Sequence, residues 1–428
     1  IDFSCFVTPP CRFDNLARTE NAFFAPLGSG NPFFLPEYAI NGEALILFQG
    51  QNADYSYDAT VMRHEFGHGV IDATSGLQPL FSLDSRSANQ EGTALNEAFA
   101  DFLASAFGGV TATGPYIAPR YPQNAQVQVG DLLRDVENTL SCPGVLWGEP
   151  HQDSQHVSAA LWEARKTHFL SNNNGATFDA AFYAALVAMG PQVDFASAAE
   201  VIAVQVGAAF PSVPQAAQKM RAIFDARGVT HCSKVLDVTG APPRAHYVIG
   251  GPNNVGANNG QLVPGPIQMK LKVPQGTQNL VITADVSASG FGGAPTVRLL
   301  AKFDQPILFT FAGGMIINDA AKTANAVFSQ AGTMTATVAL NTACDTERDV
   351  YFTLGSVTPN GATLSNVLAS TTADPTCSGN DAGIQTDAGQ VDTDGGTQMV
   401  PANPQPIDSQ LGKPAGGCGC QTTPAGWA

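Results

Sequence analysis

The sequence carries little charge, and positive charge is especially scarce. Only 13% of the 428 residues are charged, and 20 Lys and Arg against 36 Asp and Glu give a formal net charge of −16. Nucleic acids and anionic membranes are bound by basic surfaces, so this balance argues against both as partners. No run of apolar residues reaches the ~18–20 that cross a bilayer, so we expect no membrane span.

The sequence also lacks the features of a signal peptide or a translation start. It opens on Ile1-Asp2-Phe3 rather than on methionine, and no basic segment followed by an apolar core is present. We therefore expect a processed chain from which a propeptide has been removed. Its length suffices for two or three domains with a large core.

A short cluster of metal-ligand residue types is present. His64-Glu65-x-x-His68 places two histidines four residues apart, so on a helix both imidazoles project from one face. Two imidazoles at that spacing can bind one Zn²⁺ at ~2.0–2.1 Å. Glu65 lies beside the first ligand and can act as general base on a water that the metal acidifies. Asp58 is suited to cap this helix, which we expect over residues 58–74.

A second apolar helical segment, expected over 93–107, offers the remaining ligand. Glu97 and Asp101 lie four residues apart on one of its faces. A catalytic zinc takes a third protein ligand and keeps one position open, and we assign that ligand to Glu97. Asp101 can accept the other ring N–H of a ligand histidine and so orient the ring.

The His-Glu-x-x-His motif and the later Asn96-Glu97 with Asp101 resemble the zinc site of thermolysin-type and fungalysin-type metalloendopeptidases, the gluzincins. The resemblance covers roughly residues 15–230, and the two-part zinc motif is its specific portion. It implies that the two motif histidines and Glu97 bind zinc. It also implies that Glu65 is the base and that Asp101 orients a ligand histidine.

Upstream, Asn21-Ala22-Phe23-Phe24 resembles the edge strand that pairs with bound peptide in that family. An extended peptide can add to such an edge through backbone hydrogen bonds. The resemblance therefore makes Asn21 and Ala22 candidate substrate-binding residues.

Downstream, His151 stands ahead of a helical segment at 154–170, where the family places a histidine that stabilises the oxyanion. His156 competes for this role, and Glu149 is the nearest carboxylate to support His151. The family's transition-state tyrosine would fall near Pro79, and proline cannot donate a hydrogen bond. Either a residue from elsewhere replaces that tyrosine or the histidine works alone.

The pattern changes beyond residue 235. Segments such as Ile267–Val273 and Val350–Leu354 alternate apolar and polar residues and are separated by turn signals, which predicts an all-β sandwich over 240–372. This domain can bind substrate or cell wall, or stabilise the enzyme. We expect an α+β multidomain chain, with a gluzincin metallopeptidase domain over 1–235 built from the zinc helix pair and a helical bundle.

The last segment, 373–428, is rich in Asp, Gly, Thr, Gln and Pro, which predicts a flexible linker or tail. Its recurring aspartates favour a solvated acidic linker, with a Ca²⁺ loop as the alternative. Cys418-Gly419-Cys420 resembles the Cys-containing sorting signal of many myxobacterial surface proteins. A small disulfide-bonded tail is the alternative on spacing alone.

The eight cysteines favour an oxidising compartment. Proximity in the sequence suggests three disulfide pairs, which are Cys5–Cys11, Cys142–Cys232 and Cys344–Cys377. We therefore expect a bacterial protein that is secreted or displayed at the cell surface.

These features together predict a zinc endopeptidase that acts on peptide or protein substrates. Two alternatives stay open. One is a noncatalytic adhesion or structural protein built on a zinc-peptidase scaffold. The other is an aminopeptidase on the same scaffold, although the motif that would recognise a substrate N-terminus is not apparent.

Overall fold

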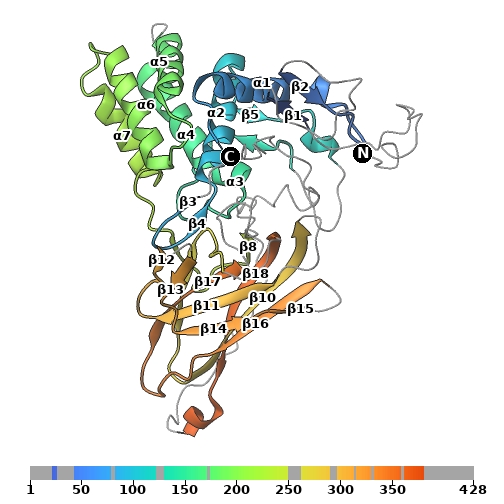
Figure 1. The fold of residues 1–428 in the computed structure, drawn as a ribbon, viewed down its shortest axis with the longest axis vertical. Helices are drawn as coiled ribbons and strands as arrows, with labels where there is room; N and C mark the ends of the chain where they lie inside the picture. The colour runs from blue at the N-terminus through green and yellow to red at the C-terminus, as the bar shows by residue number, and fades with distance from the viewer. Residues whose placement is uncertain are drawn as a thin grey trace, which may run out of the picture.

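The computed structural model describes residues 22–26, 43–78, 82–121, 130–170, 174–248, 262–289, 296–312, 315–328, 332–357 and 361–379. Over these ranges the chain is a mixed α+β protein, as its sequence predicts. The helices gather at one end of the molecule and the long strands at the other (Figure 1). Among the described residues, none of the helices combines the length and the apolar character that a membrane crossing requires.

The segments predicted as helical at 58–74, 93–107 and 154–170 are helical in the structure. The helices are α1 (Ala59–Thr74), α2 (Glu91–Gly108), α3 (Pro150–Asp153), α4 (Gln155–Ala164), α5 (Asn174–Ala188), α6 (Phe195–Ala209) and α7 (Ala216–Ala226). A π-helical turn, Arg165–Phe169, continues α4. Helices α5, α6 and α7 pack into the predicted bundle, and Gly228 follows α7 with a φ of 69°, the left-handed conformation that favours glycine after a helix.

Helix α1 begins where the sequence predicts because Asp58 caps it. One oxygen of this buried carboxylate accepts the backbone N–H groups of Thr60 and Val61, at 3.0 and 3.4 Å. The other oxygen accepts those of Tyr116 and Ile117, at 2.8 and 3.1 Å. A single side chain therefore fixes both the start of the helix and the loop that lies over it.

Helices α1 and α2 approach closely because Gly67 has no side chain. A Cβ atom placed at Gly67 would lie only 2.9 Å from the Cα atom of Ala100. Helix α2 lies almost wholly within the core, and its Phe99 and Phe102 stack edge-on against Phe182 of α5. Helix α2 therefore packs against α5 in the core and against α1 at Gly67.

The strands before the bundle are short. They form three antiparallel pairs, which are β1 (Ala22–Ala25) with β2 (Ala44–Leu47), β3 (Ser82–Leu83) with β4 (Ala88–Asn89), and β5 (Ala112–Thr113) with β6 (Arg134–Asp135). Strands β1 and β2 lie beside α1 (Figure 1).

Beyond α7 the described chain is almost entirely β. One sheet has the order β15-β16-β10-β18-β8 and the other β14-β11-β17-β9-β7, with a separate β12–β13 hairpin. The bounds are β7 (Val235–Asp237), β8 (Arg244–Val248), β9 (Gln268–Val273), β10 (Thr277–Ser289), β11 (Val297–Phe303), β12 (Phe309–Ala312), β13 (Met315–Asn318), β14 (Lys322–Asn325), β15 (Val327–Phe328), β16 (Thr333–Ala339), β17 (Arg348–Ser356) and β18 (Gly361–Ala373).

The two sheets face each other across a shared apolar core. This is the arrangement of the sandwich that the alternating pattern predicts. Its first strand, β7, precedes the predicted start at residue 240 and pairs in parallel with β9. Its last long strand, β18, ends at Ala373, and a 3₁₀ turn over Pro375–Gly379 follows in the segment expected as linker.

The helical end and the sandwich are joined by polar contacts. Lys234, just before β7, is buried between Glu91 and Asp84, with its Nζ atom 2.8 Å from Glu91. Arg244 of β8 donates to the backbone oxygen of Leu146 at 2.6 Å. The β3–β4 hairpin, directly before α2, also bonds to the sandwich through its backbone. The sandwich is therefore fixed to the segments that surround α2 and α3.

Two of the three expected cysteine pairs are present. Cys142 lies beside Cys232 and Cys344 beside Cys377, with Cα–Cα distances of 5.6 and 5.2 Å. Cys5, Cys11 and the Cys418-Gly419-Cys420 segment lie outside the described residues. The first bond ties the segment before α3 to the connection that leads into the sandwich.

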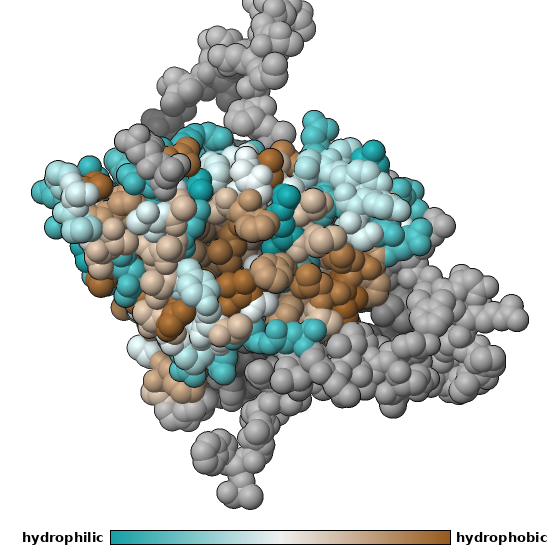
Figure 2. All heavy atoms as spheres, turned by 90° about the horizontal axis from the view of Figure 1, so that it is seen from above, coloured by the Kyte–Doolittle hydropathy of each residue, from teal (hydrophilic) through white to brown (hydrophobic). Residues whose placement is uncertain are grey.

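The surface reflects the low charge content of the sequence. Figure 2 shows the helical end, where hydrophobic residues gather around a hollow between more polar surroundings. Exposed apolar side chains on the helices include Phe66 of α1, Val187 of α5 and Val204 of α6.

The close approach of α1 and α2 leads to a prediction. In Gly67→Ala the new methyl group meets the backbone of Ala100, which cannot move without shifting α2. We expect this overpacking to lower the free energy of unfolding by about 1–3 kcal/mol, measured by urea denaturation.

Gly190→Ala is the matched control, because a Cβ atom there meets nothing within 4 Å. We expect its free energy of unfolding to stay within about 0.5 kcal/mol of wild type. Equal stability of the two variants would contradict the packing account.

Candidate metal centre

Three side chains from two helices converge at one point. His64 and His68 of α1 lie with their Nε2 atoms 3.0 Å apart. The Glu97 carboxylate of α2 reaches both, with one oxygen 3.2 Å from His64 Nε2 and the other 3.7 Å from His68 Nε2. All three residues are buried. The structure thus brings together the three residues that the sequence singles out as ligands.

These donor atoms fit a metal ion. Four ligands placed tetrahedrally at ~2.0–2.1 Å from zinc lie about 3.3 Å from one another. The three donor atoms lie within 4.8 Å of one another, and their closest separations bracket this value. Two imidazole nitrogens and one carboxylate oxygen form a donor set that suits zinc and leaves one position of a tetrahedron open. The group can therefore hold a metal ion.

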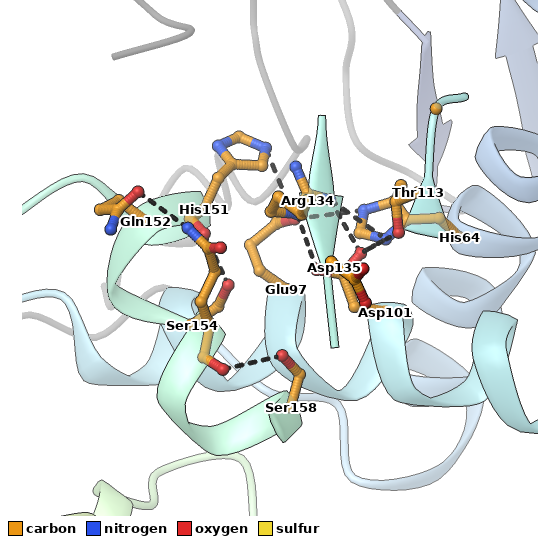
Figure 3. Close-up of polar contacts among 12 residues, drawn as sticks. His64, Glu97, Asp101, Thr113, Arg134, Asp135, His151, Gln152, Ser154 and Ser158 are labelled. Atoms are coloured by element: carbon orange, nitrogen blue, oxygen red, sulfur yellow. Dashed lines mark hydrogen bonds and ion pairs between the residues drawn. The ribbon is translucent and has the colours of Figure 1, made fainter. Parts of the chain in front are cut away.

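The far side of the His64 ring is held by a carboxylate, as predicted. Asp101 lies with its Oδ1 atom 2.8 Å from His64 Nδ1. Arg134 of β6 donates to both oxygens of Asp101, at 2.7 and 2.9 Å, and Thr113 donates to Oδ1 at 3.3 Å. Figure 3 shows this row of side chains beside Glu97. With Nδ1 engaged, Nε2 is the atom that His64 presents to a metal.

His68 has a different partner on its far side. Its Nδ1 atom lies 2.7 Å from the amide oxygen of Asn96, the residue before Glu97. Asn96 belongs to the sequence motif, but the motif alone gives it no role. The position of Asn96 next to Glu97 on α2 could have indicated this role, since adjacent residues of the helix contact the two ligand histidines. The sequence did not indicate a role for Arg134, because this residue is 33 positions from Asp101 and reaches it only through the pairing of β6 with β5.

Electrostatics hold this group together. Burial disfavours the charged forms of His64, Glu97 and Asp101, but their neighbours outweigh this effect. Burial alone would lower the pKa of His64, yet Asp101 raises it to about 9. Burial would raise the pKa of Glu97, but His151 and His68 hold it well below the usual value. Burial likewise opposes the Asp101 carboxylate, whose pKa the Arg134 guanidinium lowers.

His151 lies at the edge of this group. Its Nε2 atom is 3.4 Å from Glu97, and its side chain is 31% exposed, so the ring is open to solvent on one side. Glu149 holds the other ring nitrogen at 2.6 Å and caps α3 through the N–H groups of His151 and Gln152. The carboxylate suggested from the sequence thus contacts His151. Figure 3 shows the ring pointing toward Glu97.

His156, the competing candidate, lies elsewhere. It is fully buried, and its ring packs edge-on against Phe195 with the centroids 5.0 Å apart. Burial lowers the pKa of His156 to about 4, against a smaller opposing effect of the Asp153 backbone. This side chain is a neutral part of the core.

Glu65 is buried, and one oxygen of its carboxylate has no hydrogen-bond partner in the described part of the chain. The residue is only 6% exposed, and its Oε2 atom makes no hydrogen bond among the described residues. A buried carboxylate oxygen without a partner is costly, so such an atom commonly has a functional role.

The remaining candidates are only partly covered. Ala22 opens β1, which pairs with β2 in register Ala22 to Leu47, and its role toward substrate stays a prediction. Asn21 and Pro79 lie outside the described residues, as do the aspartates of the C-terminal segment that suggest a Ca²⁺ loop.

A scan against protein-family models finds no match for the chain, and a search of curated proteins finds no significant match. The function is therefore inferred from the geometry of the site.

The first prediction from this site concerns metal binding. We expect the purified protein to bind one Zn²⁺ per chain, and more tightly than Fe²⁺. Glu97→Ala removes a ligand and should abolish stoichiometric binding. Asp101→Asn leaves all three ligands but weakens the support of His64, so zinc affinity should fall about 10–100-fold. Metal analysis and titration calorimetry measure both effects.

Glu200→Gln is the matched control, because this α6 glutamate is 56% exposed and pairs with Arg221 at the surface. It should bind zinc like the wild type. Unchanged zinc affinity in Glu97→Ala would contradict the ligand assignment.

The second prediction concerns acid stability. His156 has a pKa of about 4 in the fold and about 6.5 when unfolded, so between these values the unfolded chain binds more protons. Its contribution to stability is present above pH 6.5 and is lost as the pH falls toward 4. From pH 7 to pH 5 the loss should be about 2 kcal/mol.

His156→Leu should lose less stability over that interval than wild type, measured as free energies of unfolding at both pH values. Comparing the two differences cancels the other titrating groups. His231→Leu, at a histidine whose side chain is 86% exposed, is the control and should behave as wild type. Equal pH dependence in all three proteins would contradict the assignment of His156.

Proposed function

We propose that this protein is a zinc-dependent endopeptidase of the gluzincin type. The observation that carries the proposal is the convergence of His64, His68 and Glu97 from two packed helices. On the same helix as the two histidines, Glu65 has one oxygen without a hydrogen-bond partner in the described part of the chain. A structural zinc site is usually closed by four protein ligands, whereas three ligands with an adjacent carboxylate favour a catalytic site.

The two imidazoles and the Glu97 carboxylate would hold Zn²⁺, which supplies a Lewis acid for the peptide carbonyl and lowers the pKa of water. Glu65 then serves as the base. Its Oε2 atom takes the proton of the attacking water and returns it to the amine nitrogen as the peptide bond breaks. Because Oε2 makes no other described hydrogen bond, no protein partner competes for this proton.

His151 is suited to stabilise the negative charge that develops on the carbonyl oxygen. With Nδ1 held by Glu149, its Nε2 atom remains to donate toward the site. Such donation requires that both ring nitrogens of His151 carry a proton. This arrangement offers a donor in place of the tyrosine that the sequence does not supply near Pro79.

The substrate would be an extended peptide or protein segment. We propose that it lies along β1 by adding to the β1–β2 pair, with Asn21 and Ala22 contributing backbone contacts. The two disulfide pairs support secretion or display at a bacterial cell surface, where such bonds persist. The Cys418-Gly419-Cys420 segment, which resembles a surface-sorting signal, favours the same location.

The proposal predicts the behaviour of Glu65→Gln. The amide cannot accept the proton, so hydrolysis of a casein or peptide substrate should fall by at least about 10²–10⁴-fold. The variant should still bind one Zn²⁺, since Glu65 is not a ligand. Rates measured with equal zinc content isolate the loss of the base.

A chelator should abolish wild-type hydrolysis, and added zinc should restore it. Glu163→Gln, at a partly exposed glutamate of α4, is the control and should keep full activity. Turnover by zinc-loaded Glu65→Gln at the wild-type rate would reject this base. A zinc-loaded wild type that cleaves no peptide would favour the noncatalytic alternative, and cleavage confined to peptides with free N-termini would favour an aminopeptidase.

A further inference from the structure

Arg244 belongs to the β-sandwich, yet its guanidinium contacts the segment that leads to His151. An NH2 atom of Arg244 donates to the backbone oxygen of Leu146 at 2.6 Å. Its Nε atom donates to the Ala245 oxygen at 3.2 Å, which fixes the direction of the side chain. Arg244 opens β8, the strand at one end of its sheet order, which pairs with β18.

The turn that receives Arg244 is held from its other side by Asp153. This buried carboxylate accepts the backbone N–H of Trp147 at 2.6 Å and that of Gly148 at 3.0 Å. Gly148 has a φ of 90°, a conformation that favours glycine, so the chain reverses sharply here. Burial raises the pKa of Asp153 well above its usual value, and the Trp147 and Gly148 amides and the positive charge of Arg244 act against that rise. One residue from each side therefore holds the same turn.

The turn ends at Glu149, the residue that holds His151. One oxygen of the Glu149 carboxylate contacts the Nδ1 atom of His151, and the other accepts the backbone N–H of Gln152 and so caps α3. The other ring nitrogen of His151, Nε2, lies 3.4 Å from Glu97. A shift of the turn would move Glu149, and with it the angle at which His151 faces the site. Arg244 is thus connected to Glu97 through its hydrogen bond to Leu146, the backbone from Leu146 to Glu149, and the contacts of His151 with Glu149 and Glu97.

We propose that Arg244 is a positioning residue, through which the sandwich holds the 146–149 turn and so sets His151 beside the metal centre. The sandwich is then part of the catalytic structure and not only an appended domain. The predicted effect of Arg244 on hydrolysis rests on the proposed function, whereas its predicted effect on the 146–149 turn does not.

The cost of burial agrees with a specific role. Burial lowers the pKa of Arg244 to about 10, so the guanidinium is still charged at neutral pH and needs its partners. A partly buried charge of this kind is stabilised by the hydrogen bonds that it makes. Removing it leaves the Leu146 oxygen without this donor and Asp153 without the opposing charge.

The test uses Arg244→Met, which keeps the length and apolar stem of the side chain, and Arg244→Lys, which keeps the charge and one donor. Hydrogen exchange of the full chain, followed by mass spectrometry, reports on the Trp147 and Gly148 amides. In Arg244→Met these amides should exchange about tenfold faster, while peptides from α1 stay protected. The kcat for peptide hydrolysis should fall about 10–100-fold with KM and zinc content unchanged, and Arg244→Lys should recover part of both losses.

Arg298→Met is the matched control, since this sandwich arginine pairs with Asn325 at the surface away from the turn. It should match wild type in exchange and in kcat. Wild-type exchange at residues 146–149 in Arg244→Met would overturn the proposal, as would faster exchange with an unchanged kcat. Should the wild type hydrolyse no peptide, the endopeptidase proposal fails, while the exchange result still decides whether Arg244 holds the turn.

Discussion

The structure depends on the contact between α1 and α2. Gly67 lets the two helix backbones approach until a side chain no longer fits between them. At that distance the histidines of one helix and the carboxylate of the other reach a common point. The large buried aromatic residues of α2 anchor it in the bundle, so the position of Glu97 is set by core packing and not by a mobile loop.

Burying so many ionisable groups requires that each charge be offset. Asp101 lies between the His64 ring and the Arg134 guanidinium, and Glu97 is surrounded by three imidazoles. Burial opposes the charged forms of Asp101, Glu97 and Arg134, and the contacts that these residues make offset that cost. Glu65 stands apart, because one of its oxygens has no such compensation. The paired residues are the proposed metal ligands and their supports, whereas Glu65 is the proposed base.

Local patterns predicted the elements and most of the site. The apolar spacing and the Asp58 cap located α1 to within one residue, and the spacing of Glu97 and Asp101 placed both on one face of α2. Arg134 and Arg244 could not be predicted in this way. Each acts across a tertiary contact between segments far apart in the chain, for which no local periodicity exists. The two-residue pairs β3–β4 and β5–β6 were also beyond reach, since two residues carry no alternation, whereas the four-residue strand β1 lies where the sequence suggested an edge strand.

The proposed function requires that His64, His68 and Glu97 bind a zinc ion. X-ray absorption spectroscopy at the zinc edge, on protein purified without added metal, reads the ligands directly. We predict a four-coordinate zinc with two imidazole nitrogens and further oxygen ligands at ~2.0–2.1 Å. A protein that takes up no zinc, or a spectrum with sulfur ligands or without imidazole, would contradict the central claim.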